Sequence, residues 1–177
     1  MDKKELRQLM RARKREHTPQ QLNQLSTIAT TSLHDIIRKE ENPHTILLYH
    51  SLPDEVNTVH LSCQLHKEGY TILLPTVIGS DLELHVYTGE AHLHTSDSFG
   101  ISESTGPIFT DYSNIDLAVI PGMAFTSDGK RLGRGKGYYD RLLPHIRCKK
   151  IGLAFPFQIV SDIPCESHDI MMDMVVY

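Results

Sequence analysis

Residues 116–143 read DLAVIPGMAFTSDGKRLGRGKGYYDRLL, and the pattern of this stretch decides the expected fold. DLAVIP, at 116–121, is mostly apolar and β-branched, as a buried strand is. A loop with several turn-forming residues follows, and the glycine-rich segment leads into a helix expected over about residues 138–147. A strand, a loop and a helix in direct succession form the repeating unit of α/β folds.

The rest of the chain repeats this alternation. Apolar residues at helical spacing predict helices at 2–15, 19–41 and 57–69, and short apolar runs predict strands at 45–49, 70–75, 82–87, 150–155 and 174–177. Strands that alternate with helices indicate an α/β fold. We therefore expect a single three-layer α/β/α domain over residues 1–177, with a mainly parallel sheet. The weakest pattern lies at residues 78–114.

The composition is that of an ordinary globular domain, with 40% hydrophobic and 23% charged residues. No apolar run approaches the roughly 20 residues that a membrane span needs. The N-terminal stretch lacks the apolar core of a secretory signal, and its acids disfavour a transit peptide. Cys63, Cys148 and Cys165 are scattered, so we expect reduced thiols. The sequence therefore predicts a cytoplasmic protein that binds no membrane.

The charges are unevenly distributed along the chain. A net charge of −4 disfavours a protein dedicated to nucleic acid, because such domains usually carry a positive excess. Cations nevertheless cluster at 130–141 and on the first helix, where Lys3, Lys4 and Arg7 lie about one turn apart. Two compact basic clusters suit a small polyanion better than a long duplex. For the cations at 11–15, a solvated helix face is the simpler interpretation.

Three glycines at alternate positions, Gly133, Gly135 and Gly137, lie among the cations of the second cluster. Glycine lets backbone N–H groups approach a ligand closely, so this loop can wrap an anion. Neither the P-loop nor the dinucleotide-binding pattern fits its spacing. A helix that begins directly after Gly137 would add free N–H groups, which favours phosphate.

Four carboxylates are candidate functional groups. Asp140, in the first turn after the glycine loop, would repel a phosphate unless a metal lay between them, which makes it a candidate Mg²⁺ ligand; alternatively it only complements the helix dipole. Asp54 and Glu55 follow a strand at the expected ligand-binding edge. Either could face the site, and a solvated loop acid is an equal alternative. Asp173 stands among apolar residues at a strand's start, so we expect a cation beside it.

Two other kinds of site are disfavoured. His85, His92 and His94 have no Cys or Glu that completes a zinc-ligand spacing. No GxSxG motif occurs, and no cysteine lies in a catalytic signature, so nucleophilic catalysis has no support. The sequence instead favours chemistry that depends on positioned cations.

The segment 121–143, PGMAFTSDGKRLGRGKGYYDRLL, closely resembles the signature of the 5-formyltetrahydrofolate cyclo-ligase family. The resemblance extends in order through the chain, with weak matching at 78–114. Its further matches are the K-x-x-x-R formed by Lys3 and Arg7, Asp54-Glu55, Leu74-Pro75 and the acid before the terminal VVY. One departure is Glu103-Ser104, where the family usually has Glu-Pro, which makes the local loop shape uncertain.

The resemblance implies an enzyme that converts 5-formyltetrahydrofolate into 5,10-methenyltetrahydrofolate. It implies ATP as co-substrate, Mg²⁺ as cofactor, and release of ADP and phosphate. The formyl oxygen would be phosphorylated first, and N10 would then attack the formyl carbon. Expected partners are ATP and 5-formyltetrahydrofolate, with or without a polyglutamate tail, bound by a monomer.

The resemblance also implies roles for individual residues. Asp140 and Asp173 look like the metal pair, and Glu55 resembles the residue that holds the pterin. Arg134, Gly135, Lys136, Gly137 and Tyr138 would line the folate side with Glu55, and the residues nearest the chemistry would be Arg134, Lys136 and Tyr138. The ATP-binding set would be Lys3, Lys4, Arg7, Arg131, Leu132, Gly133, Arg134, Gly135, Lys136, Gly137, Tyr138 and Tyr139.

Two alternative functions, from other classes of protein, remain open. A binding module with the same loop would bind ATP or folate without turnover. A sugar-phosphate isomerase-like α/β enzyme would use the same cations on a phosphate, but it would not need Asp140 and Asp173 as a metal pair.

Overall fold

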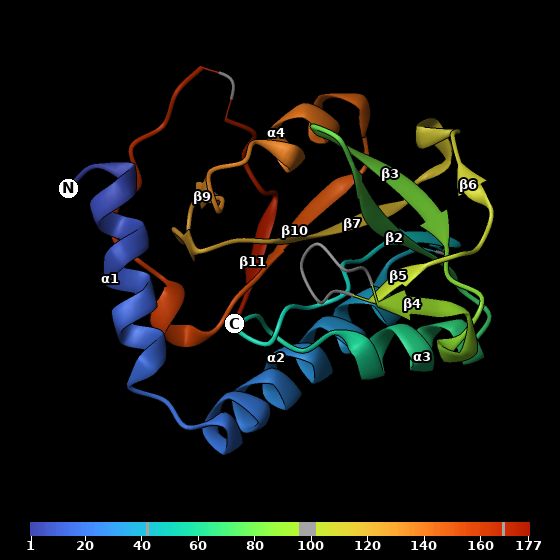
Figure 1. Ribbon diagram of the computed structural model, residues 1–177, viewed down its shortest axis with the longest axis horizontal. Helices are drawn as coiled ribbons and strands as arrows, with labels where there is room; N and C mark the ends of the chain where they lie inside the picture. The colour runs from blue at the N-terminus through green and yellow to red at the C-terminus, as the bar shows by residue number, and fades with distance from the viewer. Residues whose placement is uncertain (42, 96–101, 168) are drawn as a thin grey trace.

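A computed structural model describes residues 1–41, 43–95, 102–167 and 169–177, and its centre is a mixed, mostly parallel sheet of seven strands (Figure 1). The strand order is β11-β10-β7-β1-β2-β3-β6. The strands are β1 (Thr45–Leu47), β2 (Thr71–Ile78), β3 (Asp81–Val86), β6 (Ile108–Phe109), β7 (Leu117–Pro121), β10 (Lys149–Leu153) and β11 (Met174–Val176). The five strands from β11 to β2 are parallel, whereas β3 and β6 pair antiparallel.

The α-helices among the described residues are α1 (Lys3–Arg15), α2 (Pro19–Lys39), α3 (Val59–Lys67) and α4 (Tyr138–Leu142). Figure 1 shows α2 and α3 on one face of the sheet and α4 on the other, with α1 beside the sheet. Thr18 caps α2 through the backbone N–H of Gln21, and Pro19 occupies its first turn, as the sequence predicts. No helix in the described part of the chain is long and apolar enough to cross a bilayer.

Alternate residues of the central strands point into two separate cores. In β7, Leu117 and Val119 join the core under α2 and α3, while Ala118 and Ile120 join the core under α4. Both faces of the strand are therefore buried, which explains why DLAVIP reads as a continuous apolar run. The predicted three-layer α/β arrangement with a mainly parallel sheet is confirmed.

The helix after the glycine loop is shorter than predicted. The α-helix ends at Leu142, and a 3₁₀ turn follows over Leu143–His145, whereas the predicted helix extends to residue 147. Pro144 lies in that turn and has no backbone N–H to donate, so the α-helical pattern stops there.

In the part of the chain that the structure describes, two small strand pairs lie outside the main sheet, and the sequence pattern predicted neither. One pairs β4 (Leu93–Thr95) with β5 (Ser102–Ser104), and the other pairs β8 (Ala124–Phe125) with β9 (Arg131–Leu132). Ser104, at the departure from the family pattern, is buried, and its hydroxyl donates to the Val86 carbonyl oxygen at 2.9 Å. A serine hydroxyl thus makes a bond that a proline could not make at this position.

The β8–β9 hairpin is fixed against the sheet by the ring of Phe125. A Cβ atom added to Gly122 would lie 2.6 Å from that ring, and one added to Gly152 in β10 would lie 2.5 Å from it. The two glycines therefore form a slot that only a residue without a side chain can provide. This packing holds Arg131, the residue opposite Phe125 in the hairpin, over the end of β7.

Candidate active site

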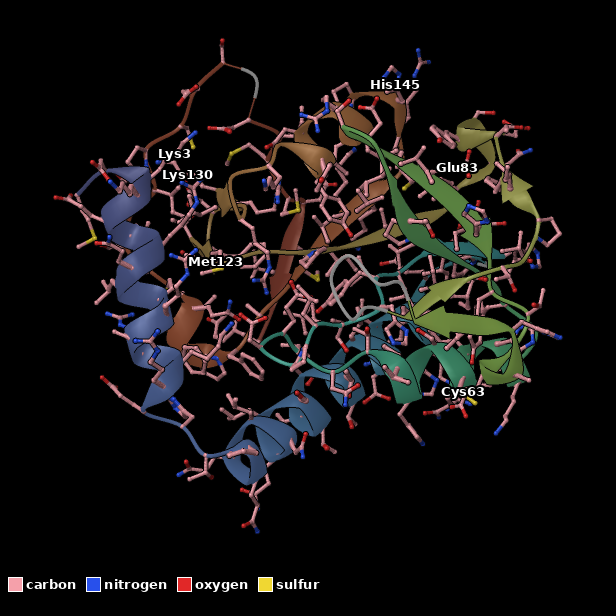
Figure 2. The ribbon with its side chains drawn as sticks, in the orientation of Figure 1. Lys3, Cys63, Glu83, Met123, Lys130 and His145 are labelled. Atoms are coloured by element: carbon pink, nitrogen blue, oxygen red, sulfur yellow. The ribbon has the colours of Figure 1, made fainter. Side chains whose placement is uncertain are left out.

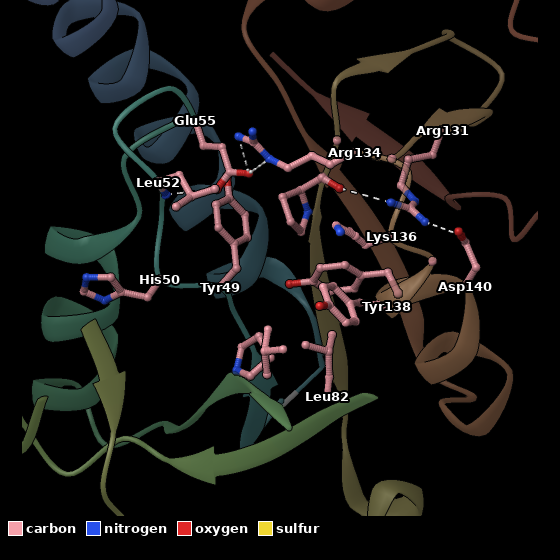
Figure 3. Close-up of a pocket in the computed structure, with 17 residues that line it drawn as sticks. Tyr49, His50, Leu52, Glu55, Leu82, Arg131, Arg134, Lys136, Tyr138 and Asp140 are labelled. Atoms are coloured by element: carbon pink, nitrogen blue, oxygen red, sulfur yellow. Dashed lines mark hydrogen bonds and ion pairs between the residues drawn. The ribbon is translucent and has the colours of Figure 1, made fainter. Parts of the chain in front are cut away.

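A cavity of about 210 Å³ opens at the carboxyl ends of β1 and β7, where ligands bind in α/β sheets (Figure 3). Pro121 ends β7 and lines the cavity, and Tyr49 and His50 line it just after β1. One part of the wall is apolar, with Leu52, Pro75, Val77 and Leu82; another part is charged, with Glu55, Arg131, Arg134, Lys136 and Asp140. The sequence placed a ligand site at these two strand ends, and the cavity lies there.

The glycine loop forms one side of this cavity. Gly135 and Gly137 have φ angles of 101° and 71°, a left-handed conformation that favours glycine. The Arg7 side chain, from α1, donates from Nε to the Gly133 carbonyl oxygen at 2.8 Å. Because α4 has five residues, its amino end supplies only a small dipole, and the cations and N–H groups of the loop itself are the main anion-binding features.

Arg131 and Asp140 form a partly buried ion pair beneath the loop. The Arg131 side chain is 4% exposed, donates to Asp140 Oδ1 and points a second nitrogen at the Pro121 carbonyl oxygen (Figure 3). Its Nε is buried without a hydrogen-bond partner among the described residues. Burial lowers the pKa of the Arg131 guanidinium, and the charge of Asp140 opposes that effect. The expected metal ligand is therefore also the counterion of a buried arginine.

Tyr139 lies against the same ion pair, with its ring centre 5.7 Å from the Arg131 guanidinium carbon. Burial raises the pKa of the Tyr139 hydroxyl well above its ordinary value, so this group stays neutral at physiological pH. The Tyr139 and Tyr138 rings add aromatic surface to the cavity next to its apolar wall.

Glu55 and Arg134 meet across the mouth of the cavity (Figure 3). Arg134 Nε donates to Glu55 Oε1 at 3.0 Å, and the backbone N–H of Leu52 donates to Oε2 at 3.0 Å. Of the two adjacent acids after β1, Glu55 lines the cavity and Asp54 does not. The structure thus selects Glu55 as the acid that faces the site.

Asp54 extends this pair into a cluster of four charges, formed by Lys14, Asp54, Glu55 and Arg134. Arg134 donates to Asp54 Oδ1, and Lys14 Nζ donates to the Asp54 backbone carbonyl and lies 3.2 Å from Oδ2. Partial burial raises the pKa of Asp54, but the hydrogen bond from Arg134 and the positive charges of Lys14 and Arg134 outweigh it and lower the value overall. Burial lowers the pKa of Lys14, and the charge of Asp54 opposes that effect.

The interpretation of the cations at 11–15 as a solvated face was wrong for two of them. The Lys14 side chain is 11% exposed because it reaches the β1–α3 loop, and Arg13 donates to the Phe157 carbonyl oxygen at 3.1 Å. Arg11 and Arg15 are exposed, as expected. Amphipathic spacing alone could not separate these cases, because their partners lie far away in the sequence.

The structure separates the three cations of the first turns of α1. Arg7 contacts the glycine loop, whereas Lys4 is exposed and is not among the residues that line this cavity. Lys3 instead pairs with Asp169 at 2.7 Å and Glu166 at 3.2 Å in the C-terminal segment, and Lys130 pairs with Asp162 there at 2.5 Å. Lys3 and Lys130, both labelled in Figure 2, are therefore neutralised by protein carboxylates.

Asp173 does not join Asp140. It precedes β11, is exposed, and its Oδ2 accepts a hydrogen bond from the backbone N–H of Lys150 at 2.7 Å, near the amino end of β10. Asp140 lies beyond the carboxyl end of β7, and Asp173 does not line the cavity. The expectation of a buried Asp173 beside a cation was wrong, since a backbone N–H and solvent satisfy it, and the structure does not bring the expected metal pair together.

A metal site made by protein groups alone is absent from the described residues. They contain no group of three or more His, Cys, Asp or Glu side chains that could hold an ion. Mg²⁺ commonly binds through one or two carboxylates and completes its shell with waters and phosphate oxygens. Asp140, at 27% exposure on the cavity wall, fits a role of that limited kind.

Sequence reasoning missed several lining residues: Tyr49, His50, Leu52, Val77 and Leu82. A usable signal existed for the first three, because Tyr49 ends a predicted strand and His50 and Leu52 follow its carboxyl end. Val77 and Leu82 lie on β2 and β3, beyond the predicted end of one strand and at the start of the other. Their inward orientation depends on the antiparallel pairing of β2 with β3, which the pattern did not specify.

Comparison with known proteins shows which family this chain resembles. A model of the 5-formyltetrahydrofolate cyclo-ligase family matches residues 1–177. The chain belongs to this family. The mouse 5-formyltetrahydrofolate cyclo-ligase is 32% identical over 151 residues, which cover 77% of this chain and 74% of the mouse protein. The Escherichia coli K12 cyclo-ligase is 29% identical over 177 residues, 95% of this chain and 96% of that protein.

A solved structure agrees. The NMR structure of Aquifex aeolicus 5,10-methenyltetrahydrofolate synthetase superposes with a TM-score of 0.85 at 30% identity, and the match covers 99% of this chain and 89% of that one. This member of the cyclo-ligase family is thus an enzyme, a folate ligase of one-carbon metabolism, and its family uses ATP. A relative from Arabidopsis thaliana is named as mitochondrial, and the cytoplasmic location expected for this chain stays a prediction.

Proposed function

We propose that this enzyme phosphorylates the formyl oxygen of 5-formyltetrahydrofolate with the γ-phosphoryl group of ATP. The bond between the β–γ bridging oxygen and the γ-phosphorus breaks, ADP departs, and the formyl carbon becomes electrophilic. N10 then attacks that carbon, loses its proton to the departing phosphate, and the bond between the carbon and the original formyl oxygen breaks. The products are 5,10-methenyltetrahydrofolate, ADP and phosphate.

The observation that carries this proposal is the two-sided character of the cavity. The cavity wall has an apolar and aromatic part and a cationic part formed by the glycine loop, and the Glu55–Arg134 pair also lines it. A flat pterin ring suits the first surface, and a triphosphate suits the second. Such a cavity can hold the formyl oxygen against the γ-phosphate, and positioning is the main requirement of phosphoryl transfer.

On the folate side, Glu55 is suited to bind the N–H groups of the pterin. Its carboxylate accepts bonds from Arg134 and from the Leu52 N–H, which fix its orientation. Each carboxylate oxygen can accept more than one hydrogen bond, so Glu55 can accept from a ligand without releasing those partners. Tyr138 would complete the folate side with the loop residues from Arg134 to Gly137.

On the ATP side, Arg134 and Lys136 belong to the glycine loop, and Arg7 donates to its Gly133 carbonyl oxygen. Lys136 is exposed at the cavity, so its ammonium group can follow the phosphate as charge moves during transfer. The remainder of the proposed ATP set is Lys3, Lys4, Arg131, Leu132, Gly133, Gly135, Gly137, Tyr138 and Tyr139. Within that set, Lys3 reaches a phosphate only by exchanging its carboxylate partners for it.

Asp140 is the proposed protein ligand for Mg²⁺, which when bound to the triphosphate neutralises charge on the phosphate oxygens. For that role Asp140 would use Oδ2 while Oδ1 continues to accept from Arg131. Asp173 is not part of this proposal, because its bond to the Lys150 N–H keeps it at the other end of the sheet.

The test uses substrate labelled with ¹⁸O in the formyl oxygen. The purified protein is mixed with the labelled folate, Mg²⁺ and ATP, and the methenyl product is followed by its near-ultraviolet absorbance. We expect turnover only with ATP, and one ¹⁸O atom in each released phosphate. Turnover with unlabelled phosphate would disprove phosphorylation of the formyl oxygen, while binding of both ligands without turnover would indicate a binding module.

A further inference from the structure

Lys14 is anchored more firmly than an ordinary cation of a surface helix. It lies in the last turn of α1, yet its side chain is 11% exposed and contacts two oxygens of Asp54, the backbone carbonyl and Oδ2. These contacts join α1 to the β1–α3 loop across 40 positions of sequence. A long side chain loses rotamer freedom when it is held in this way, so the contact must offset that loss.

Asp54, the partner of Lys14, also contacts a residue of the candidate active site. Asp54 accepts from Arg134 through its other carboxylate oxygen, and Arg134 also pairs with Glu55. The cluster therefore has two cations and two carboxylates, with Lys14 at its outer end and Glu55 in the cavity wall. Lys14 itself does not line the cavity.

We propose that Lys14 is a positioning residue, which holds Asp54 and through it the Arg134–Glu55 pair in the arrangement that binds the folate. The proposal rests on the proposed function, in which Glu55 and Arg134 contact that substrate. Lys14 would thus contribute to substrate binding although it lies outside the cavity and its place in the sequence does not suggest that role.

Removal of the Lys14 charge has two physical consequences. The Asp54 carbonyl loses its ammonium donor, so the loop that carries Glu55 is less constrained. The cluster also changes from neutral to a net charge of −1 beside a cavity that must accept the anionic folate and a triphosphate. Both effects weaken binding of the folate, whereas Arg7, Lys136 and Asp140, on the ATP side, do not belong to this cluster.

The test compares Lys14→Met, Lys14→Arg and Arg11→Met in steady-state assays with each substrate varied. Arg11 is the matched control, because it lies on the same helix, is exposed, and forms no ion pair with any described residue. For Lys14→Met we expect the KM for 5-formyltetrahydrofolate to rise about tenfold, which corresponds to about 1.4 kcal/mol, with kcat changed less than about threefold. Lys14→Arg should restore most of the loss, and Arg11→Met should match the unmodified protein.

A double-mutant cycle with Asp54→Asn separates positioning from a general loss of folding. If Lys14 acts through Asp54, adding Lys14→Met to Asp54→Asn should raise the KM little further. Additive effects, an unchanged KM in Lys14→Met, or a failure of Lys14→Arg to restore it would overturn the proposal. Should Lys14→Met fail to fold, Lys14→Arg and Asp54→Asn carry the same comparison, and absence of turnover in the unmodified protein would instead refute the proposed function.

Discussion

Replacement of Asp140 by asparagine should destabilise the protein as well as slow its reaction. The Arg131 side chain is 4% exposed, and Asp140 is its carboxylate partner among the described residues. Removal of one partner of a buried ion pair costs about 3–5 kcal/mol, because the other charge stays buried. Asp140 is 27% exposed, and asparagine keeps one acceptor, so we expect roughly 2–3 kcal/mol.

That loss should lower the melting temperature by roughly 5–10 °C in a domain of this size. Urea denaturation of Asp140→Asn, Arg131→Met and the double variant measures the coupling, with the exposed Asp35→Asn on α2 as a control. A coupling free energy near zero would refute the assignment of Asp140 as the counterion of Arg131. Mg²⁺ titration of turnover tests the second role, since a metal ligand would raise the Mg²⁺ requirement of Asp140→Asn and a pure counterion would not.

Four further substitutions test other parts of the site and fold. Glu55→Gln should raise the KM for folate far more than that for ATP, because the amide offers a donor where the pterin needs an acceptor; equal changes in titrations of both substrates would contradict this role. Arg7→Ala should raise the KM for ATP roughly tenfold, if about 1.4 kcal/mol of charge-assisted bonding is lost, and Lys3→Ala should raise it less, because Lys3 must first release Asp169 and Glu166; an unchanged ATP titration would remove that residue from the phosphate site. Gly152→Ala should lower stability in urea by about 1–3 kcal/mol, since its Cβ would lie 2.5 Å from the Phe125 ring, and full stability would show that the ring can move.

The main elements of the fold could be predicted because their patterns are local. A run such as DLAVIP is apolar throughout because both faces of β7 are buried, and Thr18 followed by Pro19 specifies the start of α2. The hairpins β4–β5 and β8–β9 could not be predicted in this way. Their strands have two or three residues each, which is too short for alternation to stand out from chance.

The site was predictable where its residues follow strands and less so where distant side chains meet. The glycine loop and Glu55 line the cavity, as their positions after β7 and β1 suggest. Lys14 finds its partner 40 positions away, and no local spacing reveals that contact. Asp173 was misjudged because apolar neighbours suggested burial, whereas it precedes β11 at an exposed edge and accepts from a backbone N–H.

The position of α1 beside the sheet also bears on how the enzyme loses activity. Its apolar face packs through Leu6 and Met10 into a small cluster with the β8–β9 hairpin, separate from the two cores of the sheet. Detachment of α1 exposes only that cluster, so it requires less free energy than opening of the seven-stranded sheet. Arg7 and Lys14 would leave together with the helix. Under mild denaturant or heat, inactivation should therefore precede global unfolding, and hydrogen exchange should be faster at the amides of α1 than in β7.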